Sequence, residues 1–324
     1  MGADLSYPQV EISPERTYIV TGGNTGIGFN VAKEIAKMRG HVIIACRNMS
    51  KAEAAIKQMQ DEYEKELKEK QENVQESNRT EPKLLNVEMM ELDLASFDKT
   101  MKFIEEFKDR HCPLHVLVCN AGLATASKVM TDDGYEMMLQ SNYLSHLLIT
   151  LHFLPILQKS GDDVRIVNVA SDAYHFGKFD PRNLNCERSF GNLATYGNSK
   201  LFQIMSTLWL SRHFKDTAVS ITSCHPGLVK TQLSQATAMG RFFSKFNART
   251  PLEGAATIIK AATDPGFKGV TGVYIKDCKV ISTTSYVRSA EIEKQLIDYS
   301  LETLSKYLPQ NLKDYIDYED QGST

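Results

Sequence analysis

The sequence lacks the marks of several protein classes. Its 324 residues contain no apolar run of about 18 residues, so we expect no membrane-spanning helix. Residues 1–6 have no apolar centre of the kind that a secretory signal needs. Lysine and arginine number 37 against 40 aspartate and glutamate, so no basic excess is present to neutralise phosphates. Nucleic acid is therefore not an expected partner.

Zinc-site spacing is also lacking among the cysteines. None of the six cysteines forms a C-x-x-C pair. Three of them, Cys46, Cys119 and Cys224, lie inside apolar strand-like runs. We therefore expect small buried thiols in a reducing compartment, a cytoplasmic location and no metal site.

Apolar residues make up 42 % of the chain and fall in alternating strand-like and helix-like segments. The expected strands cover residues 17–21, 41–46, 87–92, 115–119, 164–169, 219–224 and 273–280. The expected helices cover residues 28–38, 50–71, 98–108, 132–158, 195–214 and 251–263. This alternation predicts one Rossmann-type α/β domain, a doubly wound parallel sheet of about seven strands with helices on both faces.

The predicted domain spans residues 15–310. It follows an N-terminal extension over 1–14 and precedes a polar C-terminal tail over 311–324. Within the domain, we interpret the charged end of the second helix and the polar stretch after it, about 60–82, as an insertion rather than a linker between domains.

A glycine-rich turn, Thr21-Gly-Gly-Asn-Thr-Gly-Ile-Gly28, separates the first strand from the first helix. Its glycines allow a tight turn and the close approach of a pyrophosphate, which the N–H groups and dipole of the helix N-terminus then face. The alternative is a turn with a structural role only. The position between strand and helix favours cofactor binding, and the predicted ligands are Gly22, Asn24, Thr25, Gly26, Ile27 and Gly28.

The end of the second strand indicates which dinucleotide the turn holds. Dinucleotide folds that read the ribose hydroxyls of NAD carry an acidic residue there. Here the strand ends in Cys46-Arg47-Asn48. A guanidinium can bind a 2′-phosphate through two hydrogen bonds, whereas a carboxylate would repel it. We therefore predict NADP(H), against the alternative that Arg47 is a solvated residue at a strand end.

A tyrosine and a lysine four residues apart, Tyr196 and Lys200, stand at the start of a predicted helix. This spacing places both side chains on one helix face. A nearby ammonium stabilises a phenolate and brings the pKa of the phenol towards the working range of an acid–base catalyst. Such a pair also arises by chance. Two strands that end in Ser171 and in Asn120-Ala-Gly122 favour a site, because ligands bind at this edge of a parallel sheet.

Together these motifs resemble the short-chain dehydrogenase/reductase family, in its retinol dehydrogenase and WW-domain oxidoreductase branch. The glycine turn, Asn120-Ala-Gly122, Ser171, Tyr196-x-x-x-Lys200 and Pro226-Gly227 follow one another in the family's order over about residues 15–235. Three phrases carry the branch resemblance: residues 41–48, 114–122 and 253–256. Ala170 departs from the family, in which many members have a second serine at this position.

The resemblance implies a role for each matched residue. Tyr196 would donate or accept the proton, Lys200 would lower its pKa and hold the nicotinamide ribose, and Ser171 would bind the substrate oxygen. Asn142 would order a water that leads to Lys200. The implied cofactor contacts are Asp93 at the adenine, Asn120, Ala121 and Gly122 along the cleft, Pro226 and Gly227 in their turn, and Thr231 near the carboxamide or pyrophosphate. The alternatives are a surface amide for Asn142 and helix caps for Asp93 and Thr231.

The resemblance also implies the kind of substrate. Specificity would lie in a substrate loop at about 228–250, which contains an aromatic and basic run over 239–246. This run could cover an apolar pocket or contact a membrane surface, and the alternative is a helix packed on the protein's own core. We expect a hydrophobic, lipid-like carbonyl or alcohol such as a retinoid or steroid. The N-terminal pattern at Gly2 also fits N-myristoylation, which would make the protein peripherally membrane-associated.

Three functions remain to be distinguished. The first is an NADP(H)-dependent carbonyl–alcohol oxidoreductase, which the intact set Asn142, Ser171, Tyr196 and Lys200 favours. The second is a non-catalytic NADP-binding regulator or scaffold, which would be expected to have lost one of these side chains. The third is a peripheral membrane protein, a role that is compatible with the first. The resemblance further implies a homodimer through the helices at 132–158 and 195–214.

Overall fold

The computed structural model describes residues 5–71, 83–214, 217–230, 248–312 and 316. In this part of the chain, one mixed sheet has the order β3-β2-β1-β4-β5-β6-β7-β8. The strands are β1 (Thr17–Thr21), β2 (His41–Cys46), β3 (Val87–Glu91), β4 (Val116–Cys119), β5 (Val164–Val169), β6 (Val219–His225), β7 (Val273–Lys276) and β8 (Lys279–Ile281). All neighbouring pairs are parallel except β7 and β8. The predicted doubly wound α/β class is thus confirmed.

The last predicted strand is wrong in one respect. Residues 273–280 form a hairpin of two antiparallel strands rather than a single parallel strand. The backbone reverses at Asp277 and Cys278, which both have positive φ, at 52° and 59°. Asparagine and glycine are the residues that usually signal such a turn, and neither is present, so this turn has little sequence signal.

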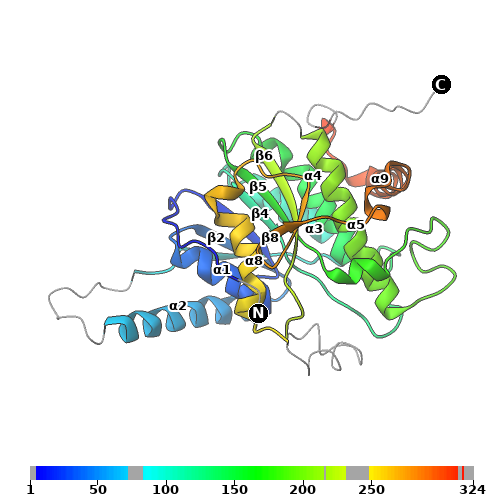
Figure 1. Ribbon diagram of the computed structural model, residues 1–324. Coiled ribbons are helices and arrows are strands. Elements are labelled where there is room, and N and C mark those ends of the chain that lie inside the picture. Colours follow the sequence, from blue (N-terminus) through cyan, green and yellow to red (C-terminus); the bar gives the residue numbers. More distant parts are fainter. Residues whose placement is uncertain (1–4, 72–82, 215–216, 231–247, 313–315, 317–324) are drawn as a thin grey trace.

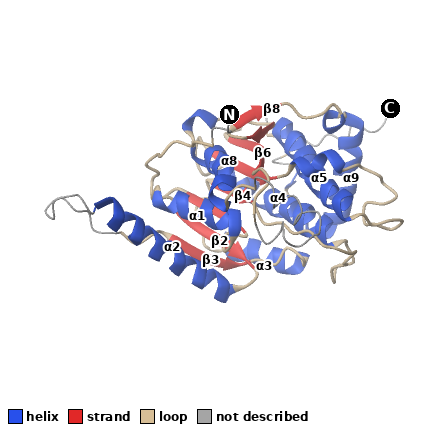
Figure 2. Cartoon of the chain, turned by 60° about the horizontal axis from the view of Figure 1, so that its bottom comes forward, coloured by secondary structure: helices blue, strands red, loops and turns tan. Residues whose placement is uncertain are grey.

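Helices cover both faces of the sheet (Figures 1 and 2). The α-helices are α1 (Gly26–Lys37), α2 (Met49–Gln71), α3 (Phe97–Lys108), α4 (Ser145–Leu157), α5 (Asn192–His213), α8 (Pro251–Thr263) and α9 (Ala290–Leu304). The short helices are the π-helix η2 (Leu139–Leu144) and the 3₁₀ turns η3 (Asp172–Phe176), η4 (Pro265–Phe267), η5 (Tyr286–Arg288) and η6 (Ser305–Tyr307). None of the described helices is both long and apolar enough to cross a membrane.

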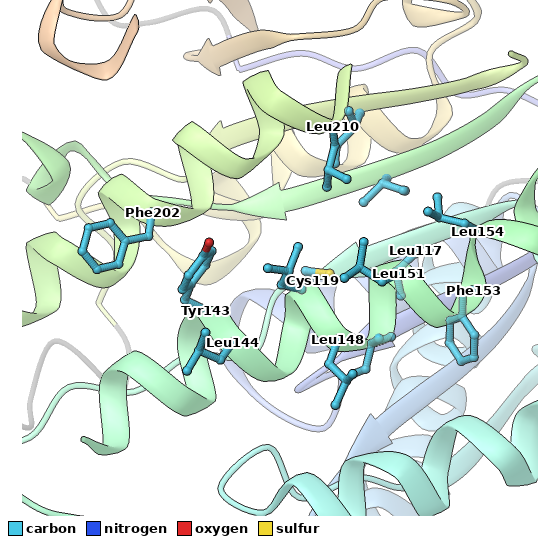
Figure 3. Packing of buried hydrophobic residues seen from close by; sticks show 14 of the residues in the cluster. Leu117, Cys119, Tyr143, Leu144, Leu148, Leu151, Phe153, Leu154, Phe202 and Leu210 are labelled. Atoms are coloured by element: carbon cyan, nitrogen blue, oxygen red, sulfur yellow. The ribbon is translucent and has the colours of Figure 1, made fainter. Parts of the chain in front are cut away.

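Two apolar cores fill the space between the sheet and its helices. The first joins one sheet face to α1, α2 and α8, and Figure 1 shows α1 and α8 side by side over this face. The second joins the other face to α3, α4, α5 and α9. In Figure 3, leucines of α4 such as Leu148 and Leu151 lie beside Leu117 and Cys119 of β4. All six cysteines are free thiols, five of them buried, as the sequence predicts.

The helix α4 illustrates why the sequence predicts this layer. Almost every one of its side chains is buried, because α4 lies between the sheet and α3 and shares a core with residues of α5. An apolar residue at nearly every position, rather than on one face only, is what such a central helix requires. The helix predicted over 132–158 is shorter than expected and consists of η2 followed by α4.

Candidate functional site

The predicted cofactor cleft lies at the carboxyl edge of the sheet, where the order of the strands reverses between β1 and β4. A cavity of about 260 Å³ opens there. Six of the residues predicted to bind the cofactor line it: Gly22, Asn24, Arg47, Asp93, Ala121 and Gly122. These six residues follow the ends of β1, β2, β3 and β4.

The glycine turn has the backbone that the sequence predicts. Gly22 and Gly26 have φ values of 66° and 60°, which other residues rarely adopt. A Cβ on Gly28 would lie 2.4 Å from Nδ2 of Asn120 and 2.5 Å from the Gly22 carbonyl oxygen. Thr25 is the N-cap of α1, and its side chain accepts no hydrogen bond from the described first turn. The N–H groups of that turn thus remain available to phosphate oxygens, so the turn fits a dinucleotide.

Asn120 supports this turn from the end of β4. Its Nδ2 donates to the carbonyl oxygen of Thr21 at 2.8 Å, and its backbone N–H donates to Thr21 Oγ1 at 2.9 Å. Its side chain also lies directly behind Gly28. Ile27, predicted as a cofactor contact, packs against the apolar core beneath α1. Both residues therefore shape the turn.

Two cations lie at the end of the cavity where β2 stops. Arg47, after β2, and Lys51, in the first turn of α2, both line it. Neither takes part in an ion pair among the described residues. The sequence prediction missed Lys51, although its place four residues after Arg47 was a usable signal. Two uncompensated cations at this position suit a phosphate.

Asp93 lies on the opposite wall of the same cavity. Its Oδ1 accepts a hydrogen bond from the Ala95 N–H at 3.2 Å, and its Oδ2 lies 3.1 Å from Nζ of Lys99. The N-cap of α3 is Ser96, which accepts from the N–H of Lys99. The alternative that Asp93 caps this helix is therefore wrong, and its place in the cavity agrees with the predicted adenine contact.

The predicted catalytic residues come together beside this cavity. Tyr196 and Lys200 lie one turn apart on α5, with Lys200 Nζ 5.7 Å from the centre of the Tyr196 ring. Ser171 follows β5 and lies close enough to Tyr196 to influence its pKa, and its Oγ accepts a hydrogen bond from the Ala173 N–H at 3.2 Å. Lys200 Nζ donates to the carbonyl oxygen of Val169 at 2.8 Å. A Cβ on Gly122 would lie 3.4 Å from Nζ, so Lys200 reaches the wall of the cofactor cavity.

The ionisation of this cluster differs from the sequence expectation. Burial raises the pKa of Tyr196 to about 12, against a smaller lowering by the nearby Ser171 hydroxyl. Burial also lowers the pKa of Lys200 to about 7, so the ammonium is only partly populated at neutral pH. The expected lowering of the tyrosine pKa by Lys200 is therefore absent here. A protonated Tyr196 is ready to act as a proton donor.

Asn142 is buried in the π-helix η2, a local widening that is frequent at functional sites. Its Oδ1 accepts from the Leu123 N–H at 2.8 Å, and its Nδ2 donates to the Leu123 carbonyl oxygen at 2.9 Å and to Ser199 Oγ at 3.0 Å. The alternative of a surface amide is wrong. Asn142 ties the loop after β4 to the helix that carries Tyr196 and Lys200.

The turn after β6 adds charged residues that the sequence prediction missed. Gly227 has a φ of 85°, and Arg249 donates to the carbonyl oxygen of Pro226 at 3.2 Å. Beside Ser171, the carboxylate of Asp172 accepts from Lys276 at 2.6 Å and from Tyr274 at 3.0 Å. Only the folded β6–β7 pair brings these residues together. Thr231 lies outside the described residues.

Comparisons with known proteins agree with this arrangement. The family model of the short-chain dehydrogenases matches residues 16–83 and 66–241. Mouse retinol dehydrogenase 14 is 33 % identical over 292 residues, which cover 88 % of this chain and 84 % of that protein. Human retinol dehydrogenase 11 is 32 % identical over 90 % of this chain and 86 % of its own length. Human polyprenol dehydrogenase is 32 % identical over 89 % and 85 %.

Solved structures share the fold. An uncharacterised protein from Mycobacterium paratuberculosis has a TM-score of 0.70 at 23 % identity, over 91 % of this chain and 95 % of that one. An NADPH-bound carbonyl reductase from chicken fatty liver has a TM-score of 0.58 at 21 % identity, over 83 % and 99 %. Fold, site motifs and sequence identity agree, so this chain belongs to the short-chain dehydrogenase/reductase family, in its retinol dehydrogenase branch.

Proposed function

We propose that the protein is an NADP(H)-dependent oxidoreductase that interconverts a carbonyl and an alcohol on a hydrophobic, lipid-like substrate such as a retinoid or steroid. Family membership makes it an alcohol–carbonyl oxidoreductase with a nicotinamide cofactor. The choice of NADP(H) and the substrate class are the proposal. The observation that carries it is the buried Tyr196, with Ser171 close enough to lower its pKa and Lys200 one turn away, beside a cavity lined by two cations.

The side chains of the site divide the chemistry among them. When bound, the nicotinamide cofactor supplies the hydride. Ser171 and Tyr196 hold the carbonyl oxygen by hydrogen bonds, and Tyr196 gives its proton to that oxygen as the alcohol forms. Lys200, next to Gly122, would hold the ribose hydroxyls, and in its protonated form it would stabilise the negative charge left on Tyr196 after proton transfer. Asn142 keeps the loop after β4 at a fixed position against α5.

Two cations support NADP(H) over NAD(H). Arg47 and Lys51 line the end of the cavity where β2 stops, and β2 carries no carboxylate at that end. Solved relatives of low identity include NADPH complexes, which agrees with this choice in the fold at large. A 2′-phosphate would be held by Arg47 through paired hydrogen bonds and by Lys51 as a point charge.

Apolar surface near the site supports a hydrophobic substrate. Phe176, five residues after Ser171, is 61 % exposed, and Leu228, directly after Gly227, is 41 % exposed. Relatives of this chain are named for retinol and for polyprenol, both long apolar alcohols. The aromatic run over 239–246 and Gly2 lie outside the described residues, so peripheral membrane contact, N-myristoylation and a cytoplasmic location stay predictions.

The test follows NADPH absorbance with the purified protein and a panel of retinoid, steroid and small carbonyls. We expect NADPH consumption with a hydrophobic carbonyl and its loss, by about 100-fold or more, in Tyr196→Phe. NADPH binding should be retained in that variant. Tight binding of NADPH with no consumption of any carbonyl would favour the alternative, a non-catalytic NADP-binding regulator or scaffold.

A further inference from the structure

Gln203 is a buried polar side chain that no part of the proposed reaction uses. It lies on α5, one turn after Lys200, and is 2 % exposed. Its Oε1 accepts a hydrogen bond from Lys200 Nζ at 2.9 Å. Its Nε2, which is also buried, has no hydrogen-bond partner among the described residues. One end of the amide is thus satisfied, and the other is not.

The unpaired Nε2 has an electrostatic explanation. A buried donor without a partner costs free energy, and the amide could not relieve this cost by turning over. The turned amide would direct two N–H donors at the ammonium of Lys200, which has three donors and no acceptor. The oxygen must therefore face Lys200. A methionine or leucine at this position would avoid the unpaired donor, but it would leave the ammonium without this acceptor.

The hydrogen bonds of Lys200 also fix its direction. Two of its three N–H donors are used by the Val169 carbonyl oxygen and by Gln203. A Cβ on Gly122 would lie 3.4 Å from Nζ and 3.5 Å from Oδ1 of Asn142, so the side of Nζ facing Gly122 lies along the cofactor cavity. The third donor is thereby left for a ligand in that cavity.

We propose that Gln203 is a positioning residue for Lys200: it holds the amine beside Gly122 and favours its protonated form. The proposal rests on the proposed catalytic role of Lys200. Gln203 itself touches neither substrate nor cofactor. Its effect would pass through the charge and the direction of the lysine, which in turn acts on Tyr196.

Among the described groups of this cluster, Lys200 alone changes its charge between pH 5 and pH 10. Burial raises the pKa of Cys119, on β4, to about 12, and that of Tyr196 to about 12. Burial lowers the pKa of His146, on α4, to about 4. Cys119, Tyr196 and His146 are therefore neutral across this range, whereas the pKa of Lys200 is about 7.

The sign of the linkage follows from the lowered pKa of Lys200. Protonation of this amine is unfavourable in the folded protein, so its destabilising contribution grows as pH falls from about 10.5 to about 7 and is complete below that. Removing the acceptor in Gln203→Met would lower the pKa by about one to two further units, the effect of one hydrogen bond to a charged group. The variant should therefore lose more stability at pH 5.5 than at pH 9.

The experiment measures urea unfolding of Gln203→Met at both pH values, with Gln140→Met as the matched control. Gln140 is also a fully buried glutamine, and it hydrogen-bonds to Thr131 and Asp133 rather than to an amine. We expect a pH-dependent loss for Gln203→Met and an equal loss at both pH values for Gln140→Met. Should Gln203→Met not fold, Gln203→Asn, whose shorter amide draws the oxygen away from Nζ, is expected to behave in the same way.

Two further measurements test whether Gln203 acts through Lys200. In a Lys200→Met background, the pH dependence of the Gln203→Met loss should vanish. In the enzyme, the basic limb of the carbonyl reduction profile should move down by about one to two pH units. Equal losses at both pH values, or a pH dependence that persists without Lys200, would overturn the proposal. A pH-dependent loss in a protein that oxidises no NADPH would support the Gln203–Lys200 coupling and count against the proposed reaction.

Discussion

At the scale of single residues, the cofactor choice rests on two side chains. We expect Arg47→Glu to raise the Kd for NADPH by more than tenfold, because a carboxylate would replace a phosphate ligand at the end of β2. The Kd for NADH should change less than threefold. Lys51→Ala should weaken NADPH binding by a smaller factor. Fluorescence titration with both cofactors measures all of these constants.

The control for this prediction is another lysine of α2, the helix that carries Lys51. Lys57, also on α2, pairs with Asp61 and does not line the cavity. Lys57→Ala should therefore leave both constants unchanged. Equal losses of NADPH and NADH affinity in Arg47→Glu would show that Arg47 supports the fold of the strand end and does not read the 2′-phosphate.

Residues that act through short motifs could be predicted from the sequence, and those that act through distant partners could not. The tyrosine–lysine pair is visible because its spacing reflects one helical turn. Gln203 is also one turn from Lys200. However, the sequence does not indicate which atoms of a buried glutamine amide have hydrogen-bond partners. The environment of Tyr196 was equally hidden, since its raised pKa comes from burial by residues far away in the chain.

At the scale of elements, strands and helices with strong patterns were predicted almost to the residue. The strands over 41–46 and 164–169 and the helix over 251–263 match their observed bounds. The helix α8 has a visible start, because Thr250 and Glu253 form a reciprocal cap and Pro251 occupies the first turn. The sequence prediction gave no element to α9, which packs against α5 and is tied to η2 by the Tyr143–Ser300 hydrogen bond.

The packing of α9 against α5 leads to a prediction about stability. Leu296 is fully buried on this helix, in the core shared with α5. Leu296→Ala should lower the free energy of unfolding by roughly 2–5 kcal/mol, because it removes buried methyl groups and leaves a cavity. Its exposed neighbour Gln295 gives the control, since Gln295→Ala should change stability by less than about 0.5 kcal/mol. Urea unfolding measures both, and similar losses in the two variants would contradict this account of α9.

At the scale of the whole molecule, α9 bears on the oligomeric state. The resemblance implies a homodimer through the helices that the structure defines as η2, α4 and α5. In this chain α9 packs on part of that surface (Figure 1). Tyr143 of η2 hydrogen-bonds to Ser300 at 2.8 Å, and Arg212 of α5 pairs with Glu293. An apolar surface that is already covered within one chain offers little to a second copy.

We therefore expect the protein to be a monomer at micromolar concentration, in contrast to the homodimer implied by the resemblance. Light scattering of the purified full-length chain gives the mass directly. Weakening the α9 contact through Leu296→Ala should then promote self-association, because it exposes the helix surface that α9 covers. A dimer in the native protein that this variant leaves intact would place the interface elsewhere. A dimer that the variant dissociates would show that α9 itself belongs to the interface. Covering of the η2 and α5 surface by α9 would then not be what limits association.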